Sequence, residues 1–346
     1  MEELTSFITH QARNRPSCQL WFILQVKYAR QPGCLPEIEM TDHSTRKSKT
    51  AAGIPPVGFG TYLIADEDAP AAVAAAIAAG YRHIDTAAGY QNEAGVGRGI
   101  REGIEAAGLD RSDIFVTTKL WPGNPAWGDK PKGYGETVAA FADSLEALGL
   151  DYVDLYLIHA PSGGSERVNE WRALVDLKAQ GKARSIGVSN YTEAHVEEIR
   201  AAGLPLPEYN QIELHPWSQK PQLLEFMAKN GIAPIAYSSL VPLSTWRAAP
   251  GQGSAKTSEM RAAGDEANSP FKAMAVKYGV TEAQVLLRWG VQKGFAVLPK
   301  SLNPVRMRQN IDLFGFEIDA EDMALLGTMD RGDGVAWATG DPRFMG

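Results

Sequence analysis

Four side chains that could transfer and stabilise a proton lie near the ends of short, largely apolar segments. Asp85 and Tyr90 lie in YRHIDTAAGY, Lys119 is near the end of IFVTTKL, and His159 ends YVDLYLIH. A tyrosine serves as a general acid when its pKa, about 10 when unperturbed, is brought toward the working pH. A neighbouring ammonium such as Lys119 lowers a phenol pKa, and Asp85 can balance that buried charge. With His159 to hydrogen-bond a substrate oxygen, the set predicts acid–base chemistry.

Each of these residues also has an ordinary structural interpretation. An aspartate at a strand end often caps a helix, and a lysine there is often solvated. A histidine is often structural, and a tyrosine can simply line a rim. All four interpretations must hold together for the site to be absent, so the combination favours a functional site made of Asp85, Tyr90, Lys119 and His159.

The elements that must position these residues follow a regular alternation. Short runs rich in β-branched and aromatic residues alternate with Ala-, Glu- and Leu-rich amphipathic segments. The predicted strands are residues 56–62, 81–87, 114–120, 152–159, 183–190, 208–214, 232–239 and 295–301. This α/β pattern predicts a (β/α)₈ TIM barrel with long loops at its C-terminal face. A doubly wound open sheet has the same alternation, but GFGTYLI lacks the third glycine of a dinucleotide-binding loop.

Polar residues gather near the ends of the predicted strands, where a barrel carries its chemistry. They are Asp85, Lys119, His159, Ser189, Asn190, Gln211, Tyr237 and Lys300. Two long connections, 121–134 and 240–269, leave from the same ends. Loops of this length in a compact domain are predicted to be lids or binding loops.

A cofactor site is predicted on the far side of the same mouth. LPKSLNPVRMRQN, residues 298–310, runs from the last strand into a helix start, where barrels often bind phosphate. Lys300 and Arg306 near one phosphate would favour the 2′-phosphate of NADP over the bare ribose of NAD, although both could be solvated surface charges. Tyr237 could stack on a flat ring, and the polar side chains Ser189, Asn190 and Gln211 could hold a carboxamide.

Other chemical groups are predicted to be structural. The glycine cluster at 95–99 comes within a helical segment and lacks dinucleotide-loop spacing, so helix packing is the better interpretation. His83 is expected to be structural, and His195 and His215 are expected to be structural or at the surface. The sequence has no H-E-x-x-H and no G-x-S-x-G, so neither a metal site nor a hydrolase elbow is predicted.

The totals limit the partners and the compartment. The 346 residues carry 34 basic and 41 acidic side chains, a net charge of −7, which predicts neither nucleic-acid nor membrane binding. The two cysteines, Cys18 and Cys34, leave the rest without disulfides, as expected for a cytoplasmic protein. Residues 1–50 are expected to be an extension that is disordered, targeting or artefactual, with Met40 as an alternative start. Residues 51–346 are expected to form one catalytic domain.

These stretches together resemble the aldo-keto reductases over about residues 50 to 330. GYRHIDTAAGYQNEAGVGRGI, LGLDYVDLYLIHAP and VLPKSLNPVRMRQN look like three signature stretches of that family, in order. GFGTY, TTKLW, IGVSNY, NQIELHP and AYSSL fall between them. The resemblance implies a monomeric oxidoreductase that transfers a hydride from NADPH to an aldehyde or ketone without a metal.

The resemblance also implies a role for each matching residue. Tyr90 would be the proton donor, Lys119 would lower its pKa, Asp85 would pair with Lys119, and His159 would orient the carbonyl. The implied cofactor residues are Thr61, Ser189, Asn190, Gln211, Tyr237, Ser238, Leu240, Lys300, Ser301, Arg306, Gln309 and Asn310. Tyr62, Trp121 and the loop after the third strand would line the substrate pocket.

The sequence departs from the family pattern in places that bear on the substrate. Ala160 stands where many members carry Trp, Gln309 stands where Glu is common, and the loop WPGNPAWGDKPKGYG is enlarged. Two alternatives remain open at this level. One is a non-catalytic, NADPH-binding regulatory subunit on the same fold, which would not need the proton donor. The other is a barrel isomerase or lyase, which the predicted cofactor site disfavours.

Overall fold

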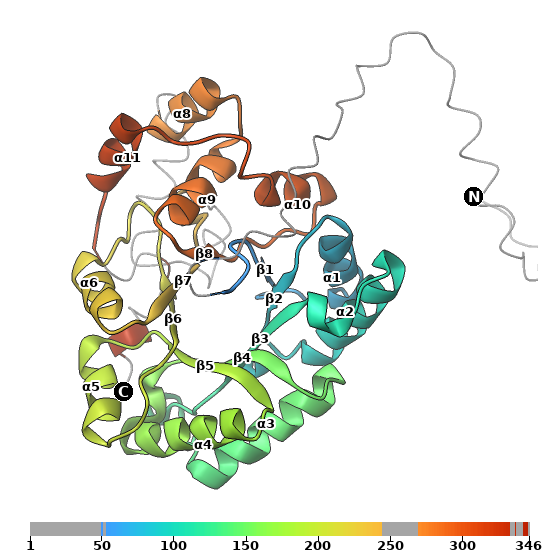
Figure 1. Cartoon of the computed structure of the whole chain (residues 1–346), viewed down its shortest axis with the longest axis vertical. Coiled ribbons are helices and arrows are strands. Elements are labelled where there is room, and N and C mark those ends of the chain that lie inside the picture. The colour runs from blue at the N-terminus through green and yellow to red at the C-terminus, as the bar shows by residue number, and fades with distance from the viewer. Residues whose placement is uncertain (1–49, 51–52, 244–268, 333–335, 337–341, 345–346) are drawn as a thin grey trace, which may run out of the picture. The chain divides into compact units, whose positions relative to one another are not determined.

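Eight parallel strands form one sheet in the part of the chain that the computed structural model describes, and each strand pairs with its sequence neighbours. The described residues are 50, 53–243, 269–332, 336 and 342–344. The strands are β1 (Phe59–Gly60), β2 (His83–Asp85), β3 (Phe115–Leu120), β4 (Val153–Ile158), β5 (Ala183–Ser189), β6 (Tyr209–Glu213), β7 (Ala233–Tyr237) and β8 (Ala296–Val297). Figure 1 shows them as a ring with the helices outside.

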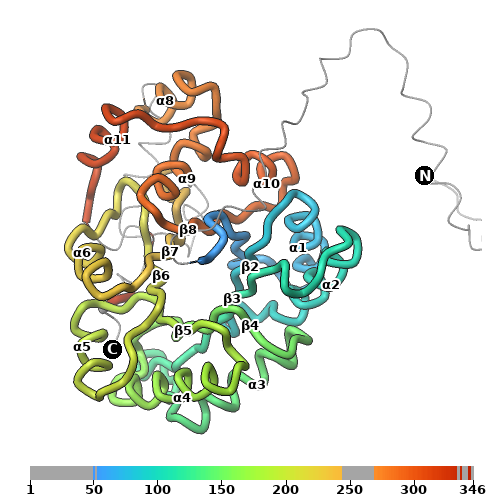
Figure 2. Tube along the Cα trace, viewed as in Figure 1, coloured from blue at the N-terminus to red at the C-terminus, as the bar shows by residue number. Residues whose placement is uncertain are grey.

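The sheet closes on itself between its first and last strands. Val57 bridges Val297 in parallel. The Gly58 amide donates to the Val297 carbonyl at 2.8 Å, and the Val297 amide donates to the Pro56 carbonyl at 2.9 Å. The tube in Figure 2 follows the same closed path. The predicted (β/α)₈ barrel is therefore confirmed, and the open-sheet alternative is wrong.

The first and last strands are much shorter than predicted. The sequence suggested strands at 56–62 and 295–301, whereas the ladder reaches only two residues in β1 and two in β8. Pro56 and Pro299 lie in these segments and have no N–H to donate, so regular pairing stops beside them. The carbonyl of Pro299 still accepts from the Gly60 amide at 3.1 Å, which continues the closure beyond the regular ladder.

Helices follow the strands around the outside of the barrel. Their bounds are α1 (Ala69–Ala78), α2 (Glu93–Ala107), α3 (Tyr134–Leu148), α4 (Arg167–Ala179), α5 (Glu193–Ala201), α6 (Pro221–Lys229), α8 (Pro270–Tyr278), α9 (Glu282–Gln292), α10 (Pro304–Ile311) and α11 (Ala320–Gly327). Several begin and end as the sequence predicts. Thr192 and Thr281 cap α5 and α9 through their side-chain oxygens. Gly108, Gly149 and Gly279 end α2, α3 and α8 in the left-handed conformation.

The glycine cluster of α2 is a packing device, as predicted. A Cβ on Gly97 would lie 2.0 Å from the carbonyl oxygen of Leu148. A Cβ on Gly99 would lie 2.7 Å from the carbonyl oxygen of Pro70, at the start of α1. Only a residue without a side chain allows α2 to approach its neighbours this closely.

The barrel interior is filled by apolar side chains and one neutral histidine. A separate buried cluster is made of Ile54, Leu155, Leu157, Tyr209, Ile235, Ala296 and Leu298. His83 is fully buried and its Nε2 lies 2.9 Å from Thr117 Oγ1. Burial and the nearby Lys119 lower the pKa of His83 to about 3, so it packs as an uncharged ring. The structural interpretation of His83 agrees with this placement.

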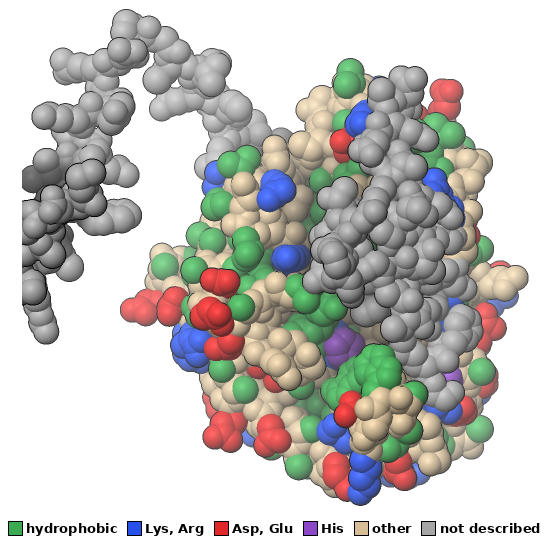
Figure 3. Space-filling view, turned by 180° about the vertical axis from the view of Figure 1, so that it is seen from behind, with side chains coloured by type: hydrophobic (Ala, Val, Ile, Leu, Met, Phe, Trp, Pro, Cys, Tyr) green, Lys and Arg blue, Asp and Glu red, His purple; other side chains and the backbone are tan. Residues whose placement is uncertain are grey.

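Some sequence expectations fall outside the described residues. The predicted extension of residues 1–50 does so apart from Thr50, and so does most of the long 240–269 connection. Within the described part of the chain, no helix is both long and apolar enough to cross a membrane. Figure 3, which views the molecule from behind Figure 1, shows acidic and basic side chains scattered over much of the described surface.

Candidate functional site

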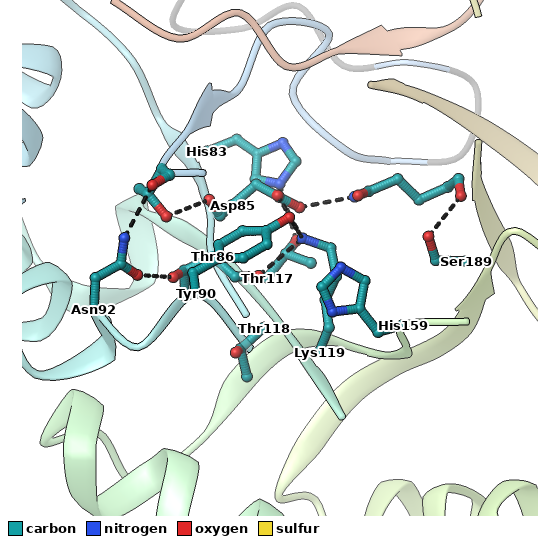
Figure 4. Close-up of polar contacts among 12 residues, drawn as sticks. His83, Asp85, Thr86, Tyr90, Asn92, Thr117, Thr118, Lys119, His159 and Ser189 are labelled. Carbon is teal, nitrogen blue, oxygen red and sulfur yellow. Dashed lines mark hydrogen bonds and ion pairs between the residues drawn. The ribbon is translucent and has the colours of Figure 1, made fainter. Parts of the chain in front are cut away.

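The four predicted catalytic residues meet at the carboxyl ends of β2, β3 and β4 (Figure 4). The Lys119 ammonium is at the centre. It donates to Asp85 Oδ1 at 2.6 Å, to the Thr86 carbonyl at 2.9 Å and to Tyr90 Oη at 3.2 Å. Parallel pairing explains the meeting, because Asp85 pairs with Thr117, two residues before Lys119 on the same face of β3. The chain thus joins groups that are 29 to 34 residues apart.

Lys119 is completely buried and nevertheless stays charged. Burial alone would lower its pKa, but the Asp85 carboxylate and the Tyr90 hydroxyl raise that pKa above the ordinary lysine value. The ammonium has three donors, and the three contacts above use all of them. Its position relative to the Tyr90 hydroxyl is therefore tightly specified.

Tyr90 lies at the end of a short 3₁₀ turn, η2 (Ala88–Tyr90), and is half-buried. The sequence suggested that Lys119 would lower the pKa of Tyr90. Lys119 does act in that direction, but burial of the phenol is the larger effect, so the pKa of Tyr90 is raised above its ordinary value. The expected net lowering is wrong for the protein alone. The hydroxyl therefore holds its proton at neutral pH.

His159 faces the same hydroxyl as an uncharged ring. Its ring centroid lies 5.4 Å from that of Tyr90 and 6.0 Å from that of Trp121, edge-to-face in both cases. Burial and the charge of Lys119 lower the pKa of His159 to about 3. Its buried Nδ1 has no hydrogen-bond partner among the residues that the structure describes. A neutral imidazole keeps one N–H donor and one acceptor nitrogen, which suits contact with an uncharged carbonyl oxygen.

The residues predicted to hold a carboxamide lie in or just after β5 and β6. They hydrogen-bond to one another, to Asp85 and to the backbone of His159. Gln211 Nε2 donates to Asp85 Oδ2 at 2.8 Å, and Ser189 Oγ donates to the Gln211 carbonyl at 2.8 Å. Asn190 Nδ2 donates to the His159 carbonyl at 3.1 Å. The sequence placed these residues at one mouth, and the structure adds that they fix the same carboxylate and histidine.

Tyr237 extends this network to β7. Its hydroxyl donates to Asn190 Oδ1 at 2.7 Å. Asn190 itself has a left-handed backbone, with φ of 62°, directly after β5. A non-glycine residue in that conformation is uncommon and concentrates at functional sites. The contact fixes the Tyr237 ring on the mouth side of the barrel.

The predicted phosphate-binding segment begins a helix where the sequence indicated. α10 starts at Pro304, and Asn303 Oδ1 accepts from the backbone amides of Val305 and Arg306. Lys300 and Arg306 are exposed. The sequence suggested free backbone amides at this helix start, but Asn303 already satisfies two of them. An anion here would therefore depend mainly on the side-chain cations.

The remaining predicted cofactor and pocket residues lie in the segments that follow four of the strands and in helix α10. Thr61 and Tyr62 follow β1, Ser238 and Leu240 follow β7, Ser301 follows β8, Gln309 and Asn310 lie in α10, and Trp121 follows β3. Thr61 is buried and its hydroxyl donates to the Asp85 carbonyl at 3.1 Å. Tyr62 is 38% exposed and its ring lies 5.1 Å from that of Tyr90.

Sequence reasoning missed the residue that holds the Tyr90 turn in place. Asn92 is fully buried, donates to the carbonyls of Thr61 and Ile64, and accepts from Thr86 Oγ1. It therefore joins the loop after β1 to the loop after β2 on either side of Tyr90. An asparagine between a short turn and a helix was the available signal. The sequence could not reveal the role of Asn92, because its partners Ile64 and Thr61 lie 28 and 31 residues away.

A buried acid outside the proposed site lies beside the turn that follows His159. Glu170 of α4 is fully buried, and neither of its carboxylate oxygens has a hydrogen-bond partner among the described residues. Its Oε1 would lie 2.1 Å from a Cβ placed on Gly163, in the turn η5 (Pro161–Glu166). Burial raises the pKa of Glu170 to about 8, and the nearby Arg167 only partly offsets that effect.

Replacing Glu170 with glutamine is expected to flatten the pH dependence of stability. The folded pKa of about 8 lies above the ordinary value of 4.5, so the folded chain holds a proton that the unfolded chain releases. Wild-type stability therefore falls as pH rises between those two values and levels off above the higher one. The variant should gain up to about 3–5 kcal/mol over the wild type by alkaline pH.

Urea unfolding at acidic, neutral and alkaline pH measures this difference. Glu102→Gln is the matched control, because Glu102 is exposed and its replacement should leave the wild-type slope unchanged. Equal slopes for Glu170→Gln and the wild type would show that Glu170 is ionised in the folded protein.

Comparison with known proteins agrees with the barrel described above. The family model of the Aldo/keto reductase family matches residues 56–331. An aldo-keto reductase of Mycolicibacterium smegmatis is 41% identical over 280 residues, 81% of this chain and 90% of that protein. The uncharacterized oxidoreductase YtbE of Bacillus subtilis is 39% identical over 288 residues, 82% of this chain and 92% of that protein.

Solved structures give the same result. An aldo/keto reductase from Brucella melitensis has a TM-score of 0.68 and 38% identity, covering 82% of this chain and 98% of its own. A Bombyx mori aldo-keto reductase in complex with NADP has a TM-score of 0.67 and 32% identity, covering 82% and 92%. The family resemblance inferred from the sequence is thereby confirmed, and the chain belongs to the aldo/keto reductase family of oxidoreductases.

Proposed function

We propose that this protein is an NADPH-dependent oxidoreductase that reduces an aldehyde or ketone to the corresponding alcohol. The observation that carries the proposal is the protonated Tyr90 hydroxyl, held 3.2 Å from the buried Lys119 ammonium and edge-on to the neutral His159 ring. A subunit that only bound the nucleotide would not need this proton donor. The geometry therefore favours an enzyme over a regulatory subunit.

The donor set at the mouth fits a dinucleotide. Ser189, Asn190 and Gln211 offer hydroxyl and amide groups for a carboxamide, and Tyr237 offers a ring face beside them. The exposed cations Lys300 and Arg306 suit a 2′-phosphate, and thus NADPH. Thr61, Ser238, Leu240, Ser301, Gln309 and Asn310 would contact the rest of the cofactor. The bound nicotinamide supplies the hydride.

The chain's own residues handle the proton. His159 donates an N–H to the carbonyl oxygen and places it beside the Tyr90 hydroxyl. Tyr90 would transfer its proton to that oxygen as negative charge develops on it during reduction. The phenolate left behind is stabilised by the Lys119 ammonium at hydrogen-bond distance. Asp85 keeps Lys119 charged and in position through the 2.6 Å contact.

All four groups come from one chain, so we propose that the protein acts as a monomer on a small-molecule carbonyl. We propose a cytoplasmic location because the 346 residues contain only two cysteines. The expected result is oxidation of NADPH, followed by its absorbance, with at least one member of a panel of aliphatic aldehydes, aromatic aldehydes, ketones and sugars. NADH should support slower turnover, because it offers no 2′-phosphate to Lys300 and Arg306. A wild-type protein that binds NADPH but oxidises it with none of these carbonyls would contradict the proposal.

The cofactor assignment is tested in the same assay with Lys300→Met and Arg306→Ala. Each removes one charge-assisted contact, so kcat/KM for NADPH should fall about 10–100-fold while that for NADH changes little. Lys293→Met is the matched control, since Lys293 is an exposed lysine after α9. Equal losses with NADPH and NADH would show that these cations do not recognise the 2′-phosphate.

A further inference from the structure

A continuous row of aromatic rings runs from the proposed proton donor out to the rim of the mouth. Tyr62 lies 5.1 Å from Tyr90, and Tyr90 lies 5.4 Å from His159, measured between ring centroids. His159 lies 6.0 Å from Trp121, and Trp121 lies 5.7 Å from Trp127 at an interplanar angle of 15°. The last pair is stacked, so Trp127 lies over one face of Trp121 and extends the aromatic row outward by one ring.

Trp127 ends this row and is largely open to solvent. It is 57% exposed, more than the exposed tyrosines Tyr62 and Tyr134. An indole is a large apolar group, and leaving it in water forfeits much of the stabilisation that its burial would contribute. Trp127 adds its surface to the Tyr62, Tyr90, His159 and Trp121 rings, and ligand sites are lined mainly by aromatic and apolar side chains of this kind. The space-filling view shows a histidine beside a patch of hydrophobic side chains (Figure 3).

The loop that carries Trp127 is built to hold it. Its turn, η4 (Pro125–Trp127), is capped by Asn124, whose carbonyl accepts from the Trp127 amide at 2.9 Å and from the Asp129 amide at 3.0 Å. Asp129 Oδ2 accepts from Trp121 Nε1 at 3.1 Å, which fixes the inner ring of the stack. The Ser162 hydroxyl donates to the Gly123 carbonyl at 2.7 Å, which ties the loop to the turn after His159.

The loop also requires a glycine at position 123, where the backbone is most tightly packed. Gly123 has φ of 87°, and a Cβ there would lie 2.2 Å from the carbonyl oxygen of Lys130. A loop with this closure and these hydrogen bonds holds its exposed ring in one place. Trp127 is therefore held in a fixed position, stacked on Trp121.

We propose that Trp127 is a specificity-determining residue that binds the outer ring of a carbonyl substrate bearing a fused, planar aryl group. The proposal rests on the carbonyl-reductase function proposed above. A substrate whose carbonyl oxygen contacts Tyr90 and His159 would lay its first ring against Trp121. Because Trp127 is one ring farther from His159 than Trp121 is, only a substrate with a second ring reaches it.

The test compares three aldehydes of increasing reach with NADPH as the cofactor: propanal, benzaldehyde and 2-naphthaldehyde. In Trp127→Ala, KM for 2-naphthaldehyde should rise about tenfold with kcat nearly unchanged, since the lost contact is the same in the ground and transition states. Propanal should be reduced with wild-type kinetics, and benzaldehyde should change little. Trp127→Phe keeps a stacking ring and should restore most of the affinity for 2-naphthaldehyde.

A second readout does not need turnover. Binding of 2-naphthalenemethanol, the product alcohol, to the protein with NADP⁺ is measured by calorimetry, and Trp127→Ala should weaken it about tenfold. Unchanged binding and unchanged KM, or equal losses with all three aldehydes in both variants, would overturn the role of Trp127 and leave the proposed function standing. A wild type that reduces no aldehyde at all would overturn both.

Discussion

Replacing Tyr90 with phenylalanine is expected to lower NADPH-dependent carbonyl reduction by about 10²–10⁴-fold while NADPH binding survives. The substitution removes one hydroxyl and keeps the ring that packs against Tyr62 and His159. Because the pKa of Tyr90 is raised, this hydroxyl is protonated at neutral pH. It lies 3.2 Å from the charged Lys119 Nζ. Without it, the developing alkoxide keeps the proposed contact with His159 but has no group in position to transfer a proton to it. Single-turnover kinetics measure the rate of carbonyl reduction, and cofactor fluorescence measures NADPH binding.

Tyr152→Phe is the matched control for this variant. Tyr152 precedes β4 and so lies at the opposite end of that strand from His159. Loss of its hydroxyl should leave turnover within about twofold of the wild type. Turnover retained by Tyr90→Phe would mean that another group supplies the proton, and the assigned acid would be wrong.

The second large effect is expected from Lys119→Met, which removes the charge at the centre of the site and keeps a side chain of similar length. The buried Asp85 carboxylate would lose the ammonium at 2.6 Å and keep only its contact with Gln211 Nε2. Breaking one side of a buried ion pair costs about 3–5 kcal/mol of unfolding free energy. The phenolate of Tyr90 would also lose its stabilising cation, so kcat should fall about 10²–10⁴-fold.

Urea unfolding and steady-state kinetics on the same preparation measure both losses. Lys182→Met is the control, because Lys182 is exposed between α4 and β5. Asp85→Asn is a complementary variant: it leaves the ammonium unpaired and should also destabilise the protein. A stable Lys119→Met protein with wild-type kcat would contradict both the buried ion pair and its catalytic part.

The fold was predictable because local sequence patterns already encode it. Strand and helix segments alternate, threonines cap α5 and α9, and glycines end α2, α3 and α8. What failed was the length of some strands, most of all β1 and β8, and also β2, which spans three residues. Whether residues beside Pro56 and Pro299 pair regularly depends on which N–H groups face the neighbouring strand, and that is a property of the closed barrel.

The gathering of the four proposed catalytic residues was also predictable, since each residue lies at or just beyond the end of a recognisable strand. The direction in which the pKa of Tyr90 shifts was not predictable from the sequence. The net direction of the Tyr90 pKa depends on how deeply the phenol is buried, and burial outweighs Lys119. Asn92 was missed because it acts through partners that only folding brings close. The loop after the third strand was predicted to line the pocket, but Trp127 was not singled out within it, because its stacking on Trp121 exists only in the folded chain.

The sequence by itself determined the family, the barrel and the identities of Asp85, Tyr90, Lys119 and His159. These depend on residue type and on short-range periodicity, which the chain carries before it folds. Only the tertiary structure decided that Gln211 donates to Asp85 across 126 residues, and that Trp127 stacks on Trp121 with its outer face in solvent. Distances and burial determine hydrogen bonding, charge and exposure, and these exist only once the eight strands have closed into a barrel.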